Sequence, residues 1–181
     1  MNDLSLSERH GLPDALQMLL REYPRDTWEG HPNCGMLTRF WLDRHLMFRR
    51  LVDMLRDDAE ARLDHALDPE AHLHRLNRFG GMLVGELHGH HQIEDHHYFP
   101  RLSRVEPRLE RGFELLDADH HALDDWLARF TEAANSVLSG GEPGPFLDAL
   151  RSFDGLLLRH LEDEEDLIVP ILLKYGEASM E

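Results

Sequence analysis

Cysteine is nearly absent from this chain, which contains only one, Cys34, among its 181 residues. A single thiol excludes a disulfide framework and any zinc or iron–sulfur site built from several cysteines. Long apolar runs are also missing, because none approaches the roughly 20 residues of a transmembrane helix. The first ten residues contain no apolar stretch typical of a signal peptide. We therefore expect a cytoplasmic protein that makes no membrane contact.

Positive charge is scarce as well. Lys and Arg number 19 against 35 Asp and Glu, which gives a formal net charge of −16 at pH 7. A surface this acidic repels phosphate backbones and anionic lipids, so we expect no nucleic-acid or membrane partner. Hydrophobic residues make up 41% of the chain, and its length suits one globular domain with a sizeable core.

Histidine, in contrast, is abundant. There are 14 histidines spread from His10 to His160, without the terminal run that an expression tag would give. Histidine is the commonest protein ligand of metal ions. Many histidines in an acidic chain with one cysteine favour a nitrogen- and oxygen-ligated site, which suits iron, zinc or manganese.

Helix breakers divide the chain into four long segments at roughly 36–67, 70–103, 107–139 and 145–175. None of them alternates with period two, so we predict an all-α fold without a sheet. Short loops between four helices indicate an up-down-up-down four-helix bundle. Residues 1–35 form an N-terminal extension with a short amphipathic helix over Leu12–Leu20, residues 36–175 form the bundle, and 176–181 form a tail.

Each segment carries a stripe of residues at alternating steps of three and four, which places the stripe on one helix face. The stripes are Trp41, His45, Phe48, Val52, Leu55 and Ala59; Leu73, Leu76, Gly80, Leu83, Leu87, His90, Glu94 and His97; Leu109, Phe113, Leu116, His120, Leu123, Leu127, Phe130, Ala134 and Val137; and Phe146, Leu150, Phe153, Leu157, His160, Glu164, Leu167 and Ile171.

Ionisable residues interrupt these apolar stripes, and burying them without partners would cost several kcal/mol each. A bound cation would offset that cost. At about 1.5 Å rise per residue, the histidines of the four helices reach one level to within roughly 6 Å. Two helices each supply a His and a Glu four residues apart, on one face. The candidate ligands are His45, His90, Glu94, His120, His160 and Glu164.

The stretch from His90 to Pro100 aligns with the stretch from His160 to Pro170 at an offset of 70 residues. In both, a His is followed by carboxylates at +4 and +5 and by Pro at +10. Together with His45 and His120, this pattern resembles the hemerythrin-like (HHE cation-binding) family over roughly 36–175.

The resemblance implies a non-haem di-iron centre whose ferrous form reacts with dioxygen. Its cofactor would be two iron ions bridged by oxide or hydroxide, with zinc or manganese as alternatives. The terminal ligands would be His45, His90, His120 and His160, and the bridging carboxylates would be Glu94 and Glu164.

One position departs from the oxygen-carrying members of that family. They have a second His one turn after the third-helix His, where this chain has Asp124. The missing His leaves one more coordination position for solvent or a small ligand. This favours sensing, storage or detoxification of dioxygen, peroxide or nitric oxide over simple oxygen carriage, and a metal- or oxygen-binding protein over a dedicated enzyme.

Several assignments remain open. His97 could be a seventh ligand or packing, Asp95 or Glu165 could replace the bridging Glu residues, and His120 is preferred over His121. Histidines away from the stripes are expected on the solvated surface, namely His88, His91 and His96, with His10, His31, His65, His72 and His74.

The glycines Gly81, Gly85 and Gly89 recur every four residues. We expect them to permit close helix packing, with a channel to the metals or a homodimer face as alternatives. A ferritin-like oxidase is a competing function, because Glu94 and His97 form one of the Glu-x-x-His motifs that it needs, although the repeat has Leu167 in place of the second His. A zinc-loaded structural bundle is another.

Overall fold

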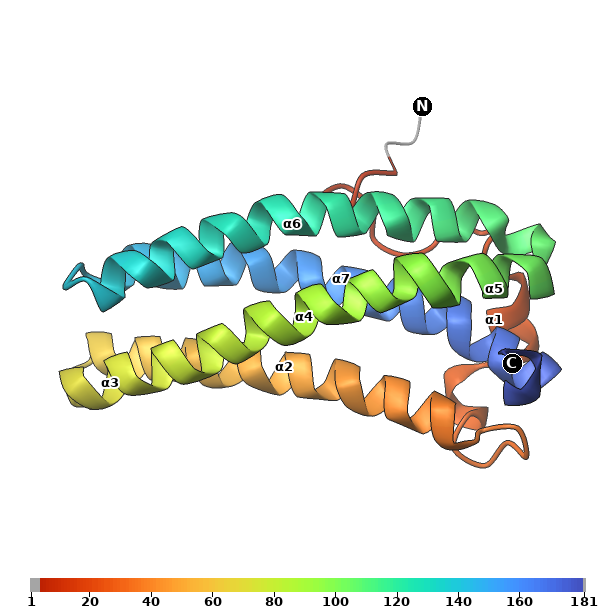
Figure 1. The fold of residues 1–181 in the computed structure, drawn as a ribbon, viewed down its shortest axis with the longest axis horizontal. Coiled ribbons are helices and arrows are strands. Elements are labelled where there is room, and N and C mark those ends of the chain that lie inside the picture. The colour runs from red at the N-terminus through yellow and green to blue at the C-terminus, as the bar shows by residue number, and fades with distance from the viewer. Residues whose placement is uncertain (1–3, 181) are drawn as a thin grey trace. The chain divides into compact units, whose positions relative to one another are not determined.

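The computed structural model describes residues 4–180, and those residues form helices and connecting loops without a strand. The long helices are α2 (Met36–Leu63), α6 (Glu110–Leu138) and α7 (Pro143–Tyr175). A further helical stretch contains α3 (Pro69–Arg75), α4 (Gly81–Ile93) and α5 (Phe99–Val105) without an intervening loop (Figure 1). The all-α prediction is confirmed. In this part of the chain, no helix is both long and apolar enough to cross a bilayer.

Local chemistry explains where the helices begin and end. The side chain of Asp68 accepts a hydrogen bond from the backbone N–H of Ala71 at 3.1 Å and caps α3, whose first residue is Pro69. Gly140 adopts a left-handed conformation, with φ of 96°, in the loop after α6. Pro143 then begins α7.

Two compact units make up the described chain. The first unit contains residues 4–45, 91–120 and 159–180, and the second contains residues 46–90 and 121–158.

The core of the second unit is apolar. The ring of Phe130 lies 5.5 Å from that of Phe146 and 5.9 Å from that of Phe153, measured between centroids. Aromatic pairs at these distances add stability beyond the apolar area that they bury. Its other buried side chains include Phe48, Leu51, Val52, Leu55, Leu76, Leu83, Leu87, Leu123, Leu127, Leu150 and Leu157.

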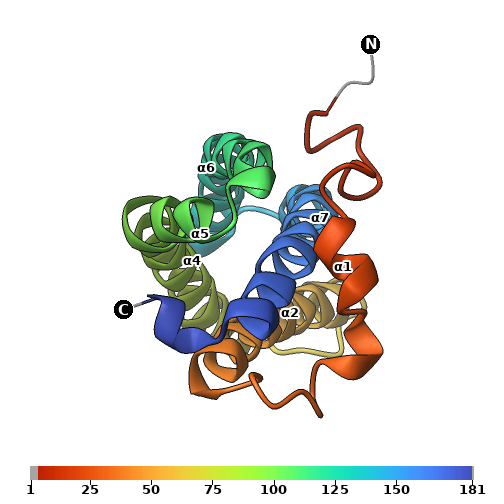
Figure 2. The same ribbon diagram turned by 90° about the vertical axis from the view of Figure 1, so that its right-hand side faces the viewer.

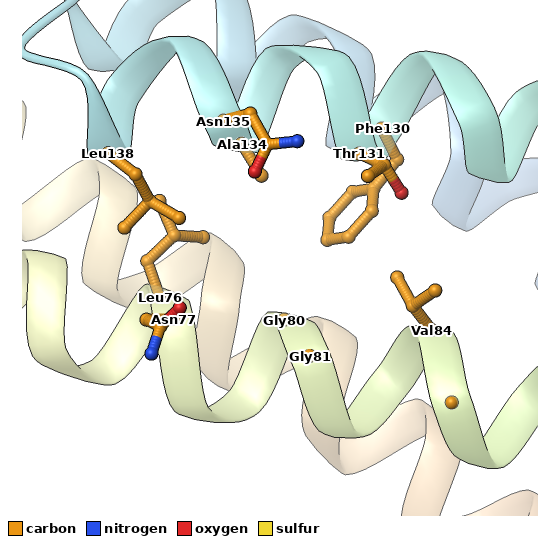
Figure 3. A pocket seen from close by; sticks show the side chains of 11 residues that line it. Leu76, Asn77, Gly80, Gly81, Val84, Phe130, Thr131, Ala134, Asn135 and Leu138 are labelled. Atoms are coloured by element: carbon orange, nitrogen blue, oxygen red, sulfur yellow. The ribbon is translucent and has the colours of Figure 1, made fainter.

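A pocket of about 290 Å³ lies in the second unit between α6 and the α3–α4 stretch (Figure 3). Gly81 and Gly85 line it, together with Val84, Phe130 and Leu138. A Cβ atom placed on either glycine, or on Gly89, would have no heavy atom within 4 Å among the described residues. Our expectation that these three glycines permit close helix packing is therefore wrong.

The N-terminal extension belongs to the first unit and packs on α7. Its helix α1 (Met18–Glu22) is shorter than the predicted Leu12–Leu20 helix and begins later. Leu16 and Leu19 belong to the same buried cluster as Leu167 and Ile168 of α7, and α1 lies beside α7 in Figure 2. A second cluster contains Trp28, Cys34, Val169 and Leu173.

The C-terminal residues close over the start of α2. Glu177, in the 3-10 turn η5 (Glu177–Met180), accepts hydrogen bonds from the backbone N–H of Thr38 at 2.8 Å and from its hydroxyl at 3.1 Å. A Cβ atom at position 35 would clash with the Glu177 carboxylate, so Gly35 permits this close approach. Arg101 donates to the carbonyl of Met180 at 2.6 Å.

Three of the four predicted stripes are buried throughout, but the second is buried only in part. Two π-helical segments, η2 (Leu76–Gly80) and η3 (Glu94–Tyr98), interrupt that stretch. Each π turn takes one residue more than an α turn, so constant α-helical spacing assigns the wrong face beyond it. His97, within the second π segment, is exposed against expectation, whereas Leu73, before the first segment, and His90, between the two, are half-buried. The buried positions are His72, Leu76, Gly80, Leu83, Leu87, His91, Glu94, Phe99 and Leu102.

Candidate metal centre

His45 of α2 lies between two consecutive carboxylates of α7. Its Nδ1 atom lies 3.0 Å from Oε1 of Glu165, and its Nε2 atom lies 3.6 Å from Oε2 of Glu164. The side chains of His45 and Glu164 are fully buried, and that of Glu165 is 4% exposed. The indole Nε1 of Trp41 donates to the other oxygen of Glu164 at 2.8 Å. This imidazole is therefore held on both sides.

His120 of α6 has the same arrangement with the other half of the sequence repeat. Its Nδ1 atom lies 2.7 Å from Oδ1 of Asp95, and its Nε2 atom lies 3.6 Å from Oε2 of Glu94. Phe99 stacks on the His120 ring with centroids 5.3 Å apart. The π-helical segment that begins at Glu94 brings Asp95 and Phe99 to the same imidazole.

The two carboxylate pairs of the sequence repeat thus contact their imidazoles in the same way. The residue at +4, Glu94 or Glu164, lies on the Nε2 side of an imidazole, and the residue at +5, Asp95 or Glu165, lies on the Nδ1 side. The alternative in which the +5 residues take the bridging position has no support in this geometry. A metal-bound His commonly donates its remaining N–H to a carboxylate, which fixes the ring and its tautomer.

His160 of α7 is a third imidazole of this kind. It is fully buried, its Nδ1 atom lies 3.4 Å from Oδ2 of Asp119, and its Nε2 atom lies 3.4 Å from Oε2 of Glu164. Burial lowers the pKa of His160 to about 3, although Asp119 acts in the opposite direction. The ring is therefore neutral near pH 7, as a metal ligand must be.

His91 is a residue that the sequence analysis placed wrongly on the surface. It is 4% exposed, its ring stacks on His120 with centroids 3.9 Å apart, and it meets His160 edge-on at 5.3 Å. The signal was present, because steps of four and three from Leu87 lead through His91 to Glu94 as readily as steps of three and four lead through His90. His72 is also buried, at 2%, against expectation.

The remaining candidates differ in burial. His90 ends the first of the two segments that make up the second unit and is half-buried, with its ring 5.2 Å from that of Phe48. His97, His121 and Asp124 are exposed, which supports the choice of His120 over its neighbour and removes the reason for a seventh ligand at His97.

Two groups of ligand atoms in the first unit are close enough to hold a metal ion. One comprises His91, His120 and His160, whose ligand atoms lie within 4.8 Å of one another, and the same limit holds for those of His45, Glu94 and Glu164. A carboxylate only accepts hydrogen bonds, so Asp95 places the hydrogen of His120 on Nδ1 and leaves a lone pair on Nε2. Among the described residues, Nε2 of His120 and Nε2 of His160 have no hydrogen-bond partner.

The carboxylates of the site also fit a bound cation. Burial raises the pKa of Glu94 to about 8, partly offset by a hydrogen bond with Glu164, while the charge of Asp95 raises it further. Two buried carboxylates in contact share a proton unless a positive charge lies between them. Imidazole and carboxylate donors suit iron, zinc and manganese. The residues present therefore fit metal ions between Glu94, Glu164 and the imidazoles.

Comparison with protein families gives one match, the hemerythrin HHE cation binding domain, over residues 36–172. The match begins with α2, ends within α7 and includes every candidate ligand. In comparisons with curated proteins and with solved structures, no protein matches the chain. Because the family match covers well over half of the 181 residues, this chain belongs to the hemerythrin HHE cation-binding domain family.

Proposed function

We propose that this protein binds two non-haem iron ions within a hemerythrin-like up-down-up-down four-helix bundle, and that the reduced centre binds dioxygen or a related small molecule. The proposed ligands are His45, His90, Glu94, His120, His160 and Glu164, with His91 added. Sensing, storage or detoxification of dioxygen, peroxide or nitric oxide is the corresponding role. A reduced iron pair supplies the electrons that such ligands require.

The main support for this proposal is that His45 and His120 each lie between two consecutive carboxylates of the sequence repeat. Each imidazole has Nδ1 on one carboxylate and Nε2 toward a second, which belongs to the opposite helix pair of the repeat. A packed apolar core needs no such arrangement, and its burial would be costly without a cation. His160 extends the same pattern with Asp119.

The protein's own residues set the conditions for ligand binding. Phe99 covers one face of His120, and Trp41 donates to Glu164, so apolar rings and a fixed N–H surround the carboxylates. Apolar surroundings exclude water and strengthen electrostatic interactions at the centre. Asp124 stands where oxygen-carrying members of the family have a fifth histidine ligand, and its side chain is exposed. The coordination position that this histidine would fill is therefore not taken by the Asp124 carboxylate.

A ferritin-like oxidase is less well supported. That architecture needs two Glu-x-x-His motifs directed into the bundle. The sequence predicts one such motif, Glu94 with His97. His97 is exposed to solvent, because it lies in a π-helical segment that turns its side chain outward.

Metal content and optical spectra test the proposal directly. Protein from iron-replete cells should contain two irons per chain, as the proposed ligand set requires. Near-ultraviolet bands of an oxo-bridged ferric pair should bleach on anaerobic reduction and return in air. A single zinc ion, or no such bands after reconstitution with iron, would refute the redox role and favour the zinc-loaded structural bundle.

A further inference from the structure

The N-terminal extension, residues 4–35, lies outside the family match but contacts the centre's surroundings. Its helix α1 lies beside α7 in Figure 2, and Leu19 of α1 is buried in the same cluster as Leu167 and Ile168. Two of its arginines, Arg9 and Arg25, contact carboxylates next to the candidate ligands.

Arg9 binds two carboxylates at once. Its Nη1 atom donates to Oδ1 of Asp119 at 2.9 Å, its Nη2 atom contacts the second oxygen of the same carboxylate, and its Nε donates to Oδ2 of Asp163 at 2.6 Å. The side chains of Arg9 and Asp119 are each 3% exposed, and that of Asp163 is fully buried. A planar guanidinium with this two-sided geometry fixes a carboxylate better than a lysine ammonium can.

Asp119 links Arg9 to the centre. The carboxylate that accepts both N–H groups of Arg9 also faces Nδ1 of His160. Asp163 has a second cation, because Nη2 of Arg159 donates to it at 2.6 Å. Asp163 therefore keeps a cationic partner without Arg9, whereas Arg9 contacts both carboxylate oxygens of Asp119.

Arg25 repeats this relation on the other side. It donates to Oε2 of Glu165 at 2.8 Å and to Oδ1 of Asp166 at 2.7 Å. The other oxygen of Glu165 faces Nδ1 of His45. Arg25 is 45% exposed, so its hold on Glu165 is weaker than that of Arg9 on Asp119.

We propose that the N-terminal extension helps to position the ligands of the metal centre. In this proposal Arg9 orients His160 through Asp119. Arg25 orients His45 through Glu165 in the same way. This inference rests on the proposed metal binding. The extension would thereby couple its own docking on α7 to the affinity of the centre for metal. Loss of an outer partner of a ligating His typically weakens metal binding by about 10- to 100-fold.

Anaerobic titration of the full chain with Fe(II), followed by calorimetry, tests this with Arg9→Met, Asp119→Asn and the double variant. We expect Arg9→Met to weaken one iron site by about tenfold. Because Arg9 acts through Asp119, the double variant should bind no more weakly than Asp119→Asn alone. Arg9→Lys keeps the charge but not the two-sided contact, and it should bind with intermediate affinity.

Arg56→Met is the matched control. Arg56 pairs with Asp154 at 3.1 Å within the second unit, away from the candidate ligands, and its loss should leave Fe(II) affinity unchanged. Circular dichroism identifies variants that fail to fold. If Arg9→Met does not fold, the same comparison is made between Arg9→Lys, Asp119→Asn and their combination.

Unchanged Fe(II) affinity in the folded Arg9 variants would overturn the inference. Additive weakening in the double variant would also overturn it, since Arg9 would then act independently of Asp119. A wild-type chain that takes up no iron refutes the proposed function instead, so the two failures are distinguishable.

Discussion

Asp95 holds the Nδ1 atom of His120 at 2.7 Å, immediately beside Glu94, whose Oε2 atom lies 3.6 Å from Nε2 of the same ring. Asp95→Asn should keep the shape but weaken this hydrogen bond, because the acceptor loses its charge. We expect metal affinity to fall by about tenfold. Fe(II) or Zn(II) titration measures this, with the exposed Asp125→Asn as a control that should bind like the wild type. Equal affinities in all three proteins would contradict the orienting role of Asp95.

His91 and His97 allow a direct comparison of two histidines on one helical stretch. His91 is buried against His120 and His160, whereas His97 is exposed. His91→Ala should weaken metal binding by at least about tenfold if His91 is a ligand, and His97→Ala should have no effect. Metal content after dialysis against a weak chelator distinguishes them. Loss of metal in His97→Ala alone would restore the assignment made from constant helical spacing.

Glu94→Gln should have opposite effects on metal-free stability and on metal binding. The unfolded chain releases the Glu94 proton near pH 4.5, whereas the folded metal-free chain holds it up to about pH 8. The metal-free wild type therefore loses stability as the pH rises across this interval.

A neutral amide avoids this loss, so at pH 8 metal-free Glu94→Gln should be more stable than the wild type by on the order of 1–3 kcal/mol. The same variant should bind metal more weakly because it lacks the carboxylate. Urea unfolding at pH 5 and pH 8, with and without metal, measures both effects. A variant less stable than the metal-free wild type at pH 8 would contradict the prediction.

Glu106 gives the opposite pH dependence, away from the candidate ligands. Hydrogen bonds and charge from Arg108, with a hydrogen bond from Tyr175 and the charge of Lys174, lower the pKa of Glu106 to about 2. The folded chain therefore binds fewer protons than the unfolded chain between about pH 4.5 and pH 2. The stabilisation is fully present above pH 4.5 and disappears as the pH falls through this range.

Glu106→Gln should cost about 1–3 kcal/mol at pH 6 and much less at pH 3. The difference in unfolding free energy between wild type and variant, measured at both pH values, isolates this carboxylate from the others. Glu142→Gln, at an exposed position, serves as a control without such a dependence. A difference that is constant with pH would show that the charge of Glu106 contributes nothing.

Gly85 faces open space within the pocket of the second unit, because a Cβ atom at this position would have no heavy atom within 4 Å among the described residues. Gly85→Ala should therefore stabilise the protein by about 0.5–1 kcal/mol, because alanine loses less backbone entropy in a helix. Thermal unfolding measures the gain. A destabilised variant would indicate that another helix or molecule occupies this surface in solution.

Helical periodicity was sufficient for most of the fold. The stripes containing Trp41, Leu116 and Phe153 lie in the core as expected, because uninterrupted α-helices keep a constant spacing. The N-terminal helix was predicted too long, since Pro13 and the turns after it delay α1 until Met18. The up-down-up-down arrangement stays a prediction.

The candidate site was harder to predict in full. Burial of His45, His120, His160, Glu94 and Glu164 followed from their places on the stripes, and their ligand roles remain proposals. The partners Asp119, Arg9 and Arg25 could not be found in this way, because contacts across 110 to 154 residues leave no periodic signal. Nor does a simple helical pattern identify a π turn, so His97 was placed on the buried face. The burial of His91 was missed because steps of three and four fit His90 and His91 equally well.

The π-helical segment at Glu94 also has an evolutionary consequence. One residue corresponds to about 100° of helical rotation, so a single-codon insertion or deletion in this stretch re-aims every side chain beyond it. His96 and His97 lie within this segment, so the same change alters which of these imidazoles faces the interior. A lineage can thus direct an existing histidine toward the site in one genetic event, without a point mutation that creates one.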